Sequence, residues 1–320
     1  MTPSAPGPAP ASAPAVASAP ALGAGTAFTL LAAFGFAAVS TLTLVATAEH
    51  VPLFSVLMWR NTLASVALVG FVGTRGYARI PPREVMRFIA IGGGGQALFT
   101  GLALTSLRYI TAAELAFLFY TYPAWVAVVQ MVRGAERLTT TRAVALLLSF
   151  GGIVVMKLGP AAGSVAAGAG PPLSAPAWHG VAMALSAAVT YGLYIPTMQH
   201  LQKHHPVPVT SAYAKLGAAL CFLLLASATQ TFTYTITPKA WEAIAALAIF
   251  STVLPSVFFL MGLMRLGPVR TAIVSTVEPF LTTLLGWLVL GQPITPGILV
   301  GGAMIVTAVS VLQFRRERVA

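Results

Sequence analysis

The sequence has no Asp, one Cys and very little charge of any kind. Charged residues make up 8% of its 320 residues, and the seven acids are all Glu, whereas a soluble domain carries about 25% charged residues. Because 57% of the residues are apolar, the chain cannot present a mostly water-facing surface. Cys221 alone excludes a disulfide framework and a cysteine-rich metal site. A short predicted turn contains three histidines, His200, His204 and His205, but no acid lies near them in the sequence. We therefore expect no metal-binding site there.

The net charge of +11 does not indicate nucleic-acid binding, because the basic residues are scattered in small clusters between apolar runs. Membrane proteins acquire the same sign from an excess of Lys and Arg on the cytoplasmic side. Residues 1–26 are nearly all Ala, Pro, Ser and Gly and include no Lys or Arg. This composition lacks the basic start of a signal peptide and cannot bury a core, so it predicts a disordered tail.

Apolar runs dominate the rest of the chain, and each is close to the roughly 20 residues that a membrane-spanning helix needs. Ten such runs are found, at residues 27–46, 53–72, 86–106, 110–131, 142–158, 178–198, 208–228, 241–263, 269–290 and 296–314. The sequence therefore predicts an all-α membrane protein with ten transmembrane helices.

The basic residues predict how these helices are oriented. With the N-terminus in the cytoplasm, thirteen of the eighteen Lys and Arg fall on the cytoplasmic side and three on the other, while Arg60 and Lys215 lie inside spans. This asymmetry is the positive-inside pattern. We therefore expect a multi-pass protein of the plasma membrane, most simply a bacterial inner membrane, with both termini in the cytoplasm.

The chain also repeats itself with a step of 156 residues. Pro123-Ala-Trp125 followed by Glu136-Arg-Leu-Thr139 corresponds to Pro279-Phe-Leu281 followed by Gln292-Pro-Ile-Thr295. Each half holds five spans, an odd number, so the second half enters the membrane in the opposite orientation, as in inverted-repeat transporters.

The predicted organisation follows from this repeat. Its parts are the tail 1–26, a first five-helix repeat at 27–158, a linker at 159–177, a second five-helix repeat at 178–314 and a basic cytoplasmic tail at 315–320.

These motifs resemble the EamA-type family of the drug/metabolite transporter superfamily. The resemblance rests on Arg60, Ala103-Leu104, Thr111-Ala112-Ala113, Pro123, Glu136-Arg-Leu-Thr139, Gly151-Gly152, Val277-Glu278-Pro279 and Gly291-Gln292-Pro-Ile-Thr295. It covers residues 27 to about 314. Two positions depart from the family pattern: Gln292 replaces the usual Glu, and Lys215 is an unexpected charge in its span. The resemblance implies a central cavity between the halves, alternating access and transport of a small solute, often efflux.

Charges inside the spans are the first candidates for a site. Arg60, Glu114, Lys215 and Glu278 would each cost at least about 2.5–3.5 kcal/mol at the centre of a bilayer, so we expect them to contact substrate or a coupling ion. The alternatives are that they pair with one another to hold helices together, or that Arg60 and Glu114 reach the interface from helix ends.

Polar residues at helical spacing are the second clue. Thr271, Ser275 and Glu278 fall on one face of the ninth span, and Tyr194 belongs to a similar stripe on the sixth span. Packing of Ser and Thr between helices is the alternative reading of any one stripe. Because such polar stripes occur on several spans, together they favour a cavity lined by these spans.

The fourth span adds aromatic side chains and a proline. We expect Tyr122 and Trp125 to form pocket walls. Pro123 and its repeat mate Pro279 each remove a backbone hydrogen bond inside a span, so we expect hinges and freed carbonyls there.

Glu278 is the expected coupling residue. Water-poor surroundings disfavour an ionised carboxylate, so the gain and loss of a proton at Glu278 would couple solute movement to a proton gradient. Arg60 or Lys215 would hold Glu278 ionised in one state; the alternative is a permanent ion pair.

The expected function is that of a secondary transporter, an exporter of a small metabolite or drug-like solute. It is expected to act without a cofactor, as a monomer or a homodimer in contact with membrane lipid. An intramembrane enzyme and a passive channel or facilitator are the alternatives. The chain lacks the H-E-x-x-H and G-x-S-x-G motifs of two enzyme classes and any nucleotide-binding motif for direct ATP coupling.

Overall fold

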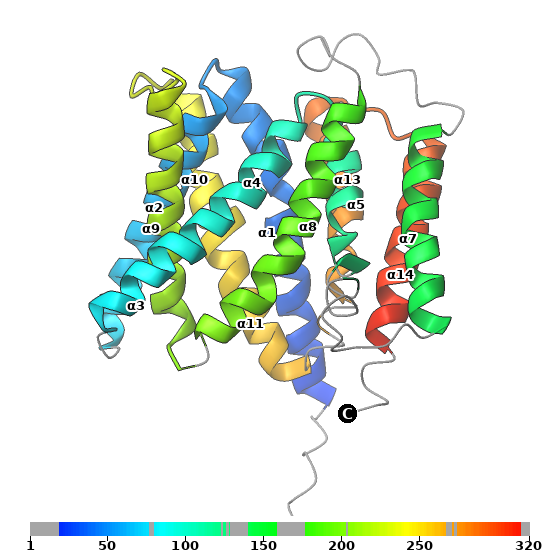
Figure 1. Ribbon diagram of the computed structural model, residues 1–320, viewed down its shortest axis with the longest axis horizontal. Coiled ribbons are helices and arrows are strands. Elements are labelled where there is room, and N and C mark those ends of the chain that lie inside the picture. The colour runs from blue at the N-terminus through cyan, green and yellow to red at the C-terminus, as the bar shows by residue number, and fades with distance from the viewer. Residues whose placement is uncertain are drawn as a thin grey trace, which may run out of the picture.

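The computed structural model describes residues 19–76, 80–122, 124–125, 128, 140–158, 177–202, 204–266, 271 and 274–314. Within these ranges the regular elements are helices, which pack side by side in one bundle (Figure 1). They are α1 (Ala19–Ala48), α2 (Leu53–Arg75), α3 (Pro82–Arg87), η1 (Phe88–Gly93), α4 (Gly94–Ser106), α5 (Ala112–Phe119), α7 (Thr140–Leu158), α8 (Ala177–Gln202), α9 (Val207–Ala228), α10 (Pro238–Ala248), η2 (Ile249–Val253), α11 (Leu254–Leu266), α13 (Glu278–Leu290) and α14 (Pro296–Phe314).

Helices lie in the described part of all ten predicted ranges. Six continuous helical segments are long and apolar enough to cross a membrane: Gly23–Ala48, Leu53–Arg75, Pro82–Ser106, Trp178–Gln202, Val207–Ala228 and Pro238–Leu263. Glu278–Leu290 and Pro296–Ala308 are shorter apolar helices. The all-helical, multi-pass membrane fold is thus supported. The exact number of ten crossings stays a prediction, because the fourth and ninth ranges include residues outside the described part.

Part of the segment that was predicted to be a disordered tail, residues 1–26, is helical. Helix α1 begins at Ala19, so the segment from residue 19 onward is helical and the prediction is wrong for it. Ala is the strongest helix former, and Pro20 is tolerated because it lies in the first turn, where its missing N–H has no helical acceptor. Residues 1–18 lie outside the described part of the chain.

The third predicted span of each half contains a π-helical turn. The first is η1, which joins α3 to α4, and the second is η2, which joins α10 to α11. At η1 the chain packs closely on α9, since a Cβ on Gly93 would collide with the Cα of Gly217. At η2 the Thr252 hydroxyl donates to the carbonyl of Leu247, five residues earlier. Such turns are rare and often mark functional sites.

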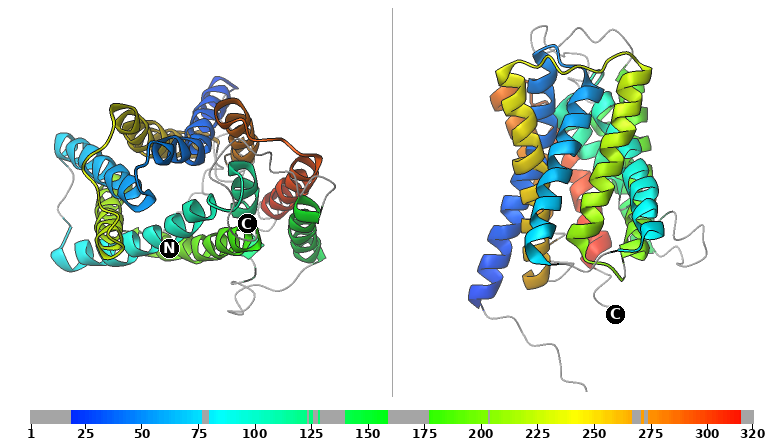
Figure 2. Two further views of the ribbon diagram at one scale, coloured as in Figure 1. Left: turned by 90° about the horizontal axis from the view of Figure 1, so that it is seen from above. Right: turned by 90° about the vertical axis from the view of Figure 1, so that its left-hand side faces the viewer.

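Helices α7 and α14, the last of each half, lie together at one edge of the bundle (Figures 1 and 2). Their backbones approach closely, because a Cβ on Gly152 would come within 2.6 Å of the carbonyl oxygen of Gly301. Both ranges have few polar residues, so the other helices are the candidates for building a polar site.

The histidine-rich turn after α8 needs a correction. His200 belongs to α8 itself, outside the turn. No acid lies near these histidines in the sequence, but the Glu84 carboxylate of α3 contacts the His205 ring nitrogen Nε2. The two residues are 121 positions apart, so only the packing of α3 beside the start of α9 brings them together. No group of three or more metal-ligating side chains occurs among the residues that the structure describes.

Candidate functional site

The fourth and ninth spans are both interrupted at repeat-related positions. Helix α5 ends at Phe119, and Tyr120 and Thr121 form a turn before helical structure resumes at Tyr122. In the other half, a turn at Thr276 and Val277 precedes α13. The two turns are separated by the same step of 156 residues that relates the halves of the sequence. Each half therefore contributes one discontinuous helix.

Pro279 explains the second interruption and its chemistry. A helical carbonyl normally accepts from the N–H four residues later, but proline has no N–H, so the carbonyl of Ser275 loses its helical donor. The hydroxyl of Tyr120, on the first half, lies 2.7 Å from that carbonyl oxygen and 2.9 Å from Oε2 of Glu278. The freed carbonyl predicted from Pro279 is thus part of a contact between the two halves.

Aromatic rings surround this contact. Tyr122, the repeat mate of Glu278, packs against Tyr191 of α8 with ring centroids 4.9 Å apart. Phe119 lies 5.1 Å from the same Tyr191 ring. Tyr194 continues the cluster along α8, pressed so closely on α4 that a Cβ on Gly95 would lie 2.7 Å from its ring. The predicted residues Tyr122, Tyr194, Ser275 and Glu278 therefore lie in one connected region.

Arg60 belongs to a second polar group, between α2 and η2. Its side chain is 8% exposed, and its Nε donates to Oγ1 of Thr252 at 2.9 Å. The π-helical turn at η2 presents Thr252 to it. Nη1 of Arg60 is buried and has no hydrogen-bond partner within the described ranges. Among the described residues, the buried guanidinium of Arg60 thus has an uncharged hydroxyl as its hydrogen-bond partner.

Lys215 lies on α9, which packs against α2, where the Ser65 hydroxyl donates to the Ala212 carbonyl at 3.1 Å. Its position is one residue before the repeat mate of Arg60. Lys215 is partly buried and makes no ion pair or hydrogen bond with any residue that the structure describes. Neither cation is paired with Glu278 in this part of the chain, so the structure does not contain the permanent ion pair that was the alternative to proton exchange.

Two other predicted side chains serve local packing or capping. Glu114 forms a capping box with Thr111 at the start of α5, where its Oε2 accepts from the Thr111 backbone N–H at 2.9 Å. The Trp125 ring packs against Phe150 of α7, with centroids 5.4 Å apart. Glu114 thus lies at a helix end, as one of its alternatives supposed, and a role for Trp125 in a pocket wall stays a prediction.

The remaining predicted residues are less informative. Thr271 is fully buried, one turn before Ser275, whose hydroxyl donates to the Thr271 carbonyl at 2.9 Å. Pro123 lies outside the described residues.

Gln292, which stands where the family usually has Glu, has a structural role. Its Oε1 accepts from the backbone N–H of Ala112 at 3.1 Å and so caps α5 from the opposite half of the chain. An amide oxygen supplies the same acceptor as a carboxylate, so the usual acid is not needed for this contact.

Sequence reasoning did not single out Tyr120, Tyr191 or Thr252 as site residues. The signal for Tyr120 was present, since it lies at the repeat mate of the turn that precedes Glu278. Tyr191 and Thr252 gave no such signal, because their roles depend on which helices α8 and η2 pack against.

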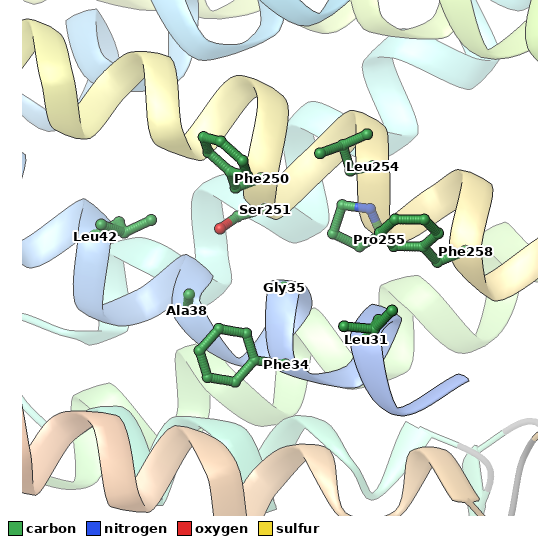
Figure 3. Close-up of a pocket in the computed structure, with 10 residues that line it drawn as sticks. All are labelled: Leu31, Phe34, Gly35, Ala38, Leu42, Phe250, Ser251, Leu254, Pro255 and Phe258. Carbon is green, nitrogen blue, oxygen red and sulfur yellow. The ribbon is translucent and has the colours of Figure 1, made fainter. Parts of the chain in front are cut away.

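A separate apolar cavity of about 300 Å³ lies between α1 and the η2–α11 segment (Figure 3). Phe34, Leu42 and Phe250 are among its walls, and Ser251 contributes a buried hydroxyl that has no hydrogen-bond partner in the described ranges. It contains none of the predicted site residues. The central cavity between the halves remains a prediction.

Comparisons with known proteins agree with this architecture. Residues 23–158 and 178–314 both match the EamA-like transporter family. Over 295 residues the chain is 22% identical to the uncharacterized transporter YetK of Bacillus subtilis (strain 168), covering 91% of this chain and 87% of that protein. A protein of known crystal structure has the same fold, with a TM-score of 0.63 and 20% identity over 93% of this chain and 99% of the other. With both halves matched, the chain belongs to the EamA-like transporter family.

Proposed function

We propose that the protein is a secondary transporter that moves a small solute across the plasma membrane by alternating access. The observation that carries this proposal is the pair of interrupted helices, one in each half, at repeat-related positions. In transporters built from inverted repeats, discontinuous helices form the substrate and ion sites at the interface of the halves. Here the Tyr120 hydroxyl links the two interruptions.

The interrupted helices also supply the moving parts. The two segments on either side of a turn are not joined by a continuous series of helical hydrogen bonds, so one can pivot against the other at low energetic cost. Pro279 prevents one of these hydrogen bonds from forming, because it has no N–H. The Tyr120 contact joins the halves in this conformation. Rocking of one half against the other breaks that contact and exposes the site to the opposite side.

Glu278 carries the coupling proton in this proposal. The Tyr120 hydroxyl has a single proton but lies within hydrogen-bond distance of two acceptors, the Ser275 carbonyl and the Glu278 carboxyl. When Glu278 is protonated, it donates to Tyr120, which donates to Ser275. When Glu278 is ionised, it accepts from Tyr120 and the Ser275 carbonyl loses its donor. Protonation thus decides whether the freed carbonyl is satisfied.

Export is the proposed direction, with both termini in the cytoplasm. The positive-inside asymmetry supports the orientation. Inward protons exchanged for outward solute would then drive efflux through Glu278.

The test uses purified protein in proteoliposomes. Glu278→Gln keeps the size and hydrogen bonding of the protonated acid, so we expect this variant to exchange solute for solute but to lose accumulation driven by a pH gradient. Glu242→Gln, which changes an exposed acid on α10, serves as the control and should behave like the unchanged protein. Gradient-driven accumulation that survives in Glu278→Gln would remove Glu278 as the proton carrier. Downhill flux alone, with no exchange, would instead indicate a passive facilitator.

A further inference from the structure

Two buried or partly buried cations in the membrane interior have no described counter-ion. Arg60 uses Nε on a neutral hydroxyl and leaves Nη1 buried without a partner, and Lys215 makes no hydrogen bond or ion pair with a described residue. Buried charges in proteins are normally paired. Neither cation has an acid as its partner among the residues that the structure describes.

The acids of the described chain are engaged elsewhere or exposed. Glu49 pairs with Lys239 at 2.7 Å, Glu84 with His205, and Glu114 caps α5. Glu242 is exposed, and Glu278 contacts Tyr120. The other two acids of the chain, Glu136 and Glu317, lie outside the described residues.

The two cations also lie at similar levels along their helices. Helices α2 and α9 run antiparallel, because Ser55 near the start of α2 donates to the Thr231 carbonyl just beyond the end of α9. Further along, the Ser65 hydroxyl of α2 donates to the Ala212 carbonyl of α9. Because the helices are antiparallel, Arg60, five residues before Ser65, and Lys215, three residues after Ala212, lie on the same side of this contact. A rise of 1.5 Å per residue places them at levels that differ by about 3 Å, in the interior of both helices.

The neighbouring polar side chains are neutral and hydrogen-bonded. Asn61, next to Arg60, accepts from Nε2 of Gln96 at 3.2 Å and donates to the Leu57 carbonyl at 2.7 Å. The residue before Gln96 is Gly95, against which the Tyr194 ring packs. A ligand held by the cations would thus have the edge of the aromatic cluster within a short distance along α4.

We propose that Arg60 and Lys215 bind the anionic group of the transported solute, a carboxylate or a phosphate, and that the solute is a small organic anion. Arg60 supplies a planar donor and Lys215 a point charge, which suit either group. This inference rests on the proposed transport function and names its substrate class. It assigns the two cations to substrate and Glu278 to the proton, as separate sites in this conformation.

The test measures thermal unfolding of the full chain in phosphatidylcholine nanodiscs, which contain no anionic lipid. The probes are benzoate, phenyl phosphate and inorganic phosphate, with benzylammonium and benzyl alcohol as ring-matched cationic and neutral controls. We expect the anions alone to raise the unfolding temperature. Lys215→Gln should weaken the apparent affinity for them by about tenfold or more, whereas Lys215→Arg should retain it. Lys239→Gln, which removes an exposed cation outside the site, should leave it unchanged.

Each outcome decides the proposal. Stabilisation by benzylammonium and not by the anions overturns it, as does the absence of stabilisation by every anion, or anion binding that Lys215→Gln leaves intact in a monodisperse sample. Stabilisation by added phosphatidylglycerol and by no soluble anion assigns the cations to a lipid headgroup and also overturns it.

Uptake of the bound probe into proteoliposomes is measured separately from binding. Lys215-dependent anion binding without transport supports the anion site and contradicts the transport function. If the protein transports a solute and no anion inhibits that transport, the anion site is contradicted and the transport function is retained.

Discussion

Replacing Tyr120 by Phe tests the contact that joins the two interrupted helices. The substitution removes the hydroxyl that lies 2.7 Å from the Ser275 carbonyl and 2.9 Å from Glu278 and keeps the ring. Because Pro279 has no N–H, no backbone donor replaces the hydroxyl at Ser275. A buried carbonyl left unsatisfied costs about 1–3 kcal/mol, so we expect Tyr120→Phe to lower the free energy of unfolding by that amount.

The contribution of the carbonyl can be isolated by combining this change with Pro279→Ala. Alanine at 279 provides the missing N–H, so in that background the Ser275 carbonyl has a helical donor and Tyr120→Phe loses only an ordinary hydrogen bond. Such bonds average about 0.6 kcal/mol within membrane proteins. The cost of Tyr120→Phe should therefore be smaller in the Pro279→Ala background by more than about 0.5 kcal/mol, the limit within which independent changes add.

Unfolding in mixed micelles of mild detergent and sodium dodecyl sulfate, followed by tryptophan fluorescence, measures all four proteins of this cycle. Tyr213→Phe is the matched control, since the Tyr213 hydroxyl has no hydrogen bond to any residue that the structure describes; it should change stability little. Equal costs of Tyr120→Phe in both backgrounds would show that Pro279 does not create the need for the hydroxyl, and would refute the reasoning.

Two further changes probe how the halves are held together. Gln292→Ala removes the acceptor that caps Ala112 and should lower the free energy of unfolding by about 0.5–2 kcal/mol, whereas Gln292→Glu should retain most of it; equal losses in both variants, measured in the same micelles, would show that the cap contributes nothing. Gly217→Ala forces a Cβ onto the Ile89 carbonyl oxygen and should cost about 1–3 kcal/mol or more through overpacking. Gly70→Ala, which has nothing within 4 Å, should not be destabilising, and a Gly217→Ala protein of unchanged stability would contradict the close packing.

The helices of this protein were largely predictable from its sequence. In a bilayer each backbone polar group must be bonded within the protein, so a long apolar run has little choice other than a helix. The described helices lie where the apolar runs predicted them, and the departure at the start of α1 reflects the helix-forming tendency of Ala, which the low-complexity composition obscured. Position in the repeat also predicted Pro279 as the origin of a freed carbonyl.

The partners of the buried polar groups were decided by the tertiary structure. The decisive contacts join residues far apart in the sequence: 158 positions separate Tyr120 from Glu278, 192 separate Arg60 from Thr252, and 180 separate Ala112 from Gln292. A helical stripe in the sequence shows which side chains share a face, but it carries no information on which helix that face meets or at what height. For this reason the sequence by itself determined the apolar helices, the repeat and which charges lie within the helices. The packing of the helices determined that Glu278 contacts a tyrosine and that Arg60 contacts a threonine of η2.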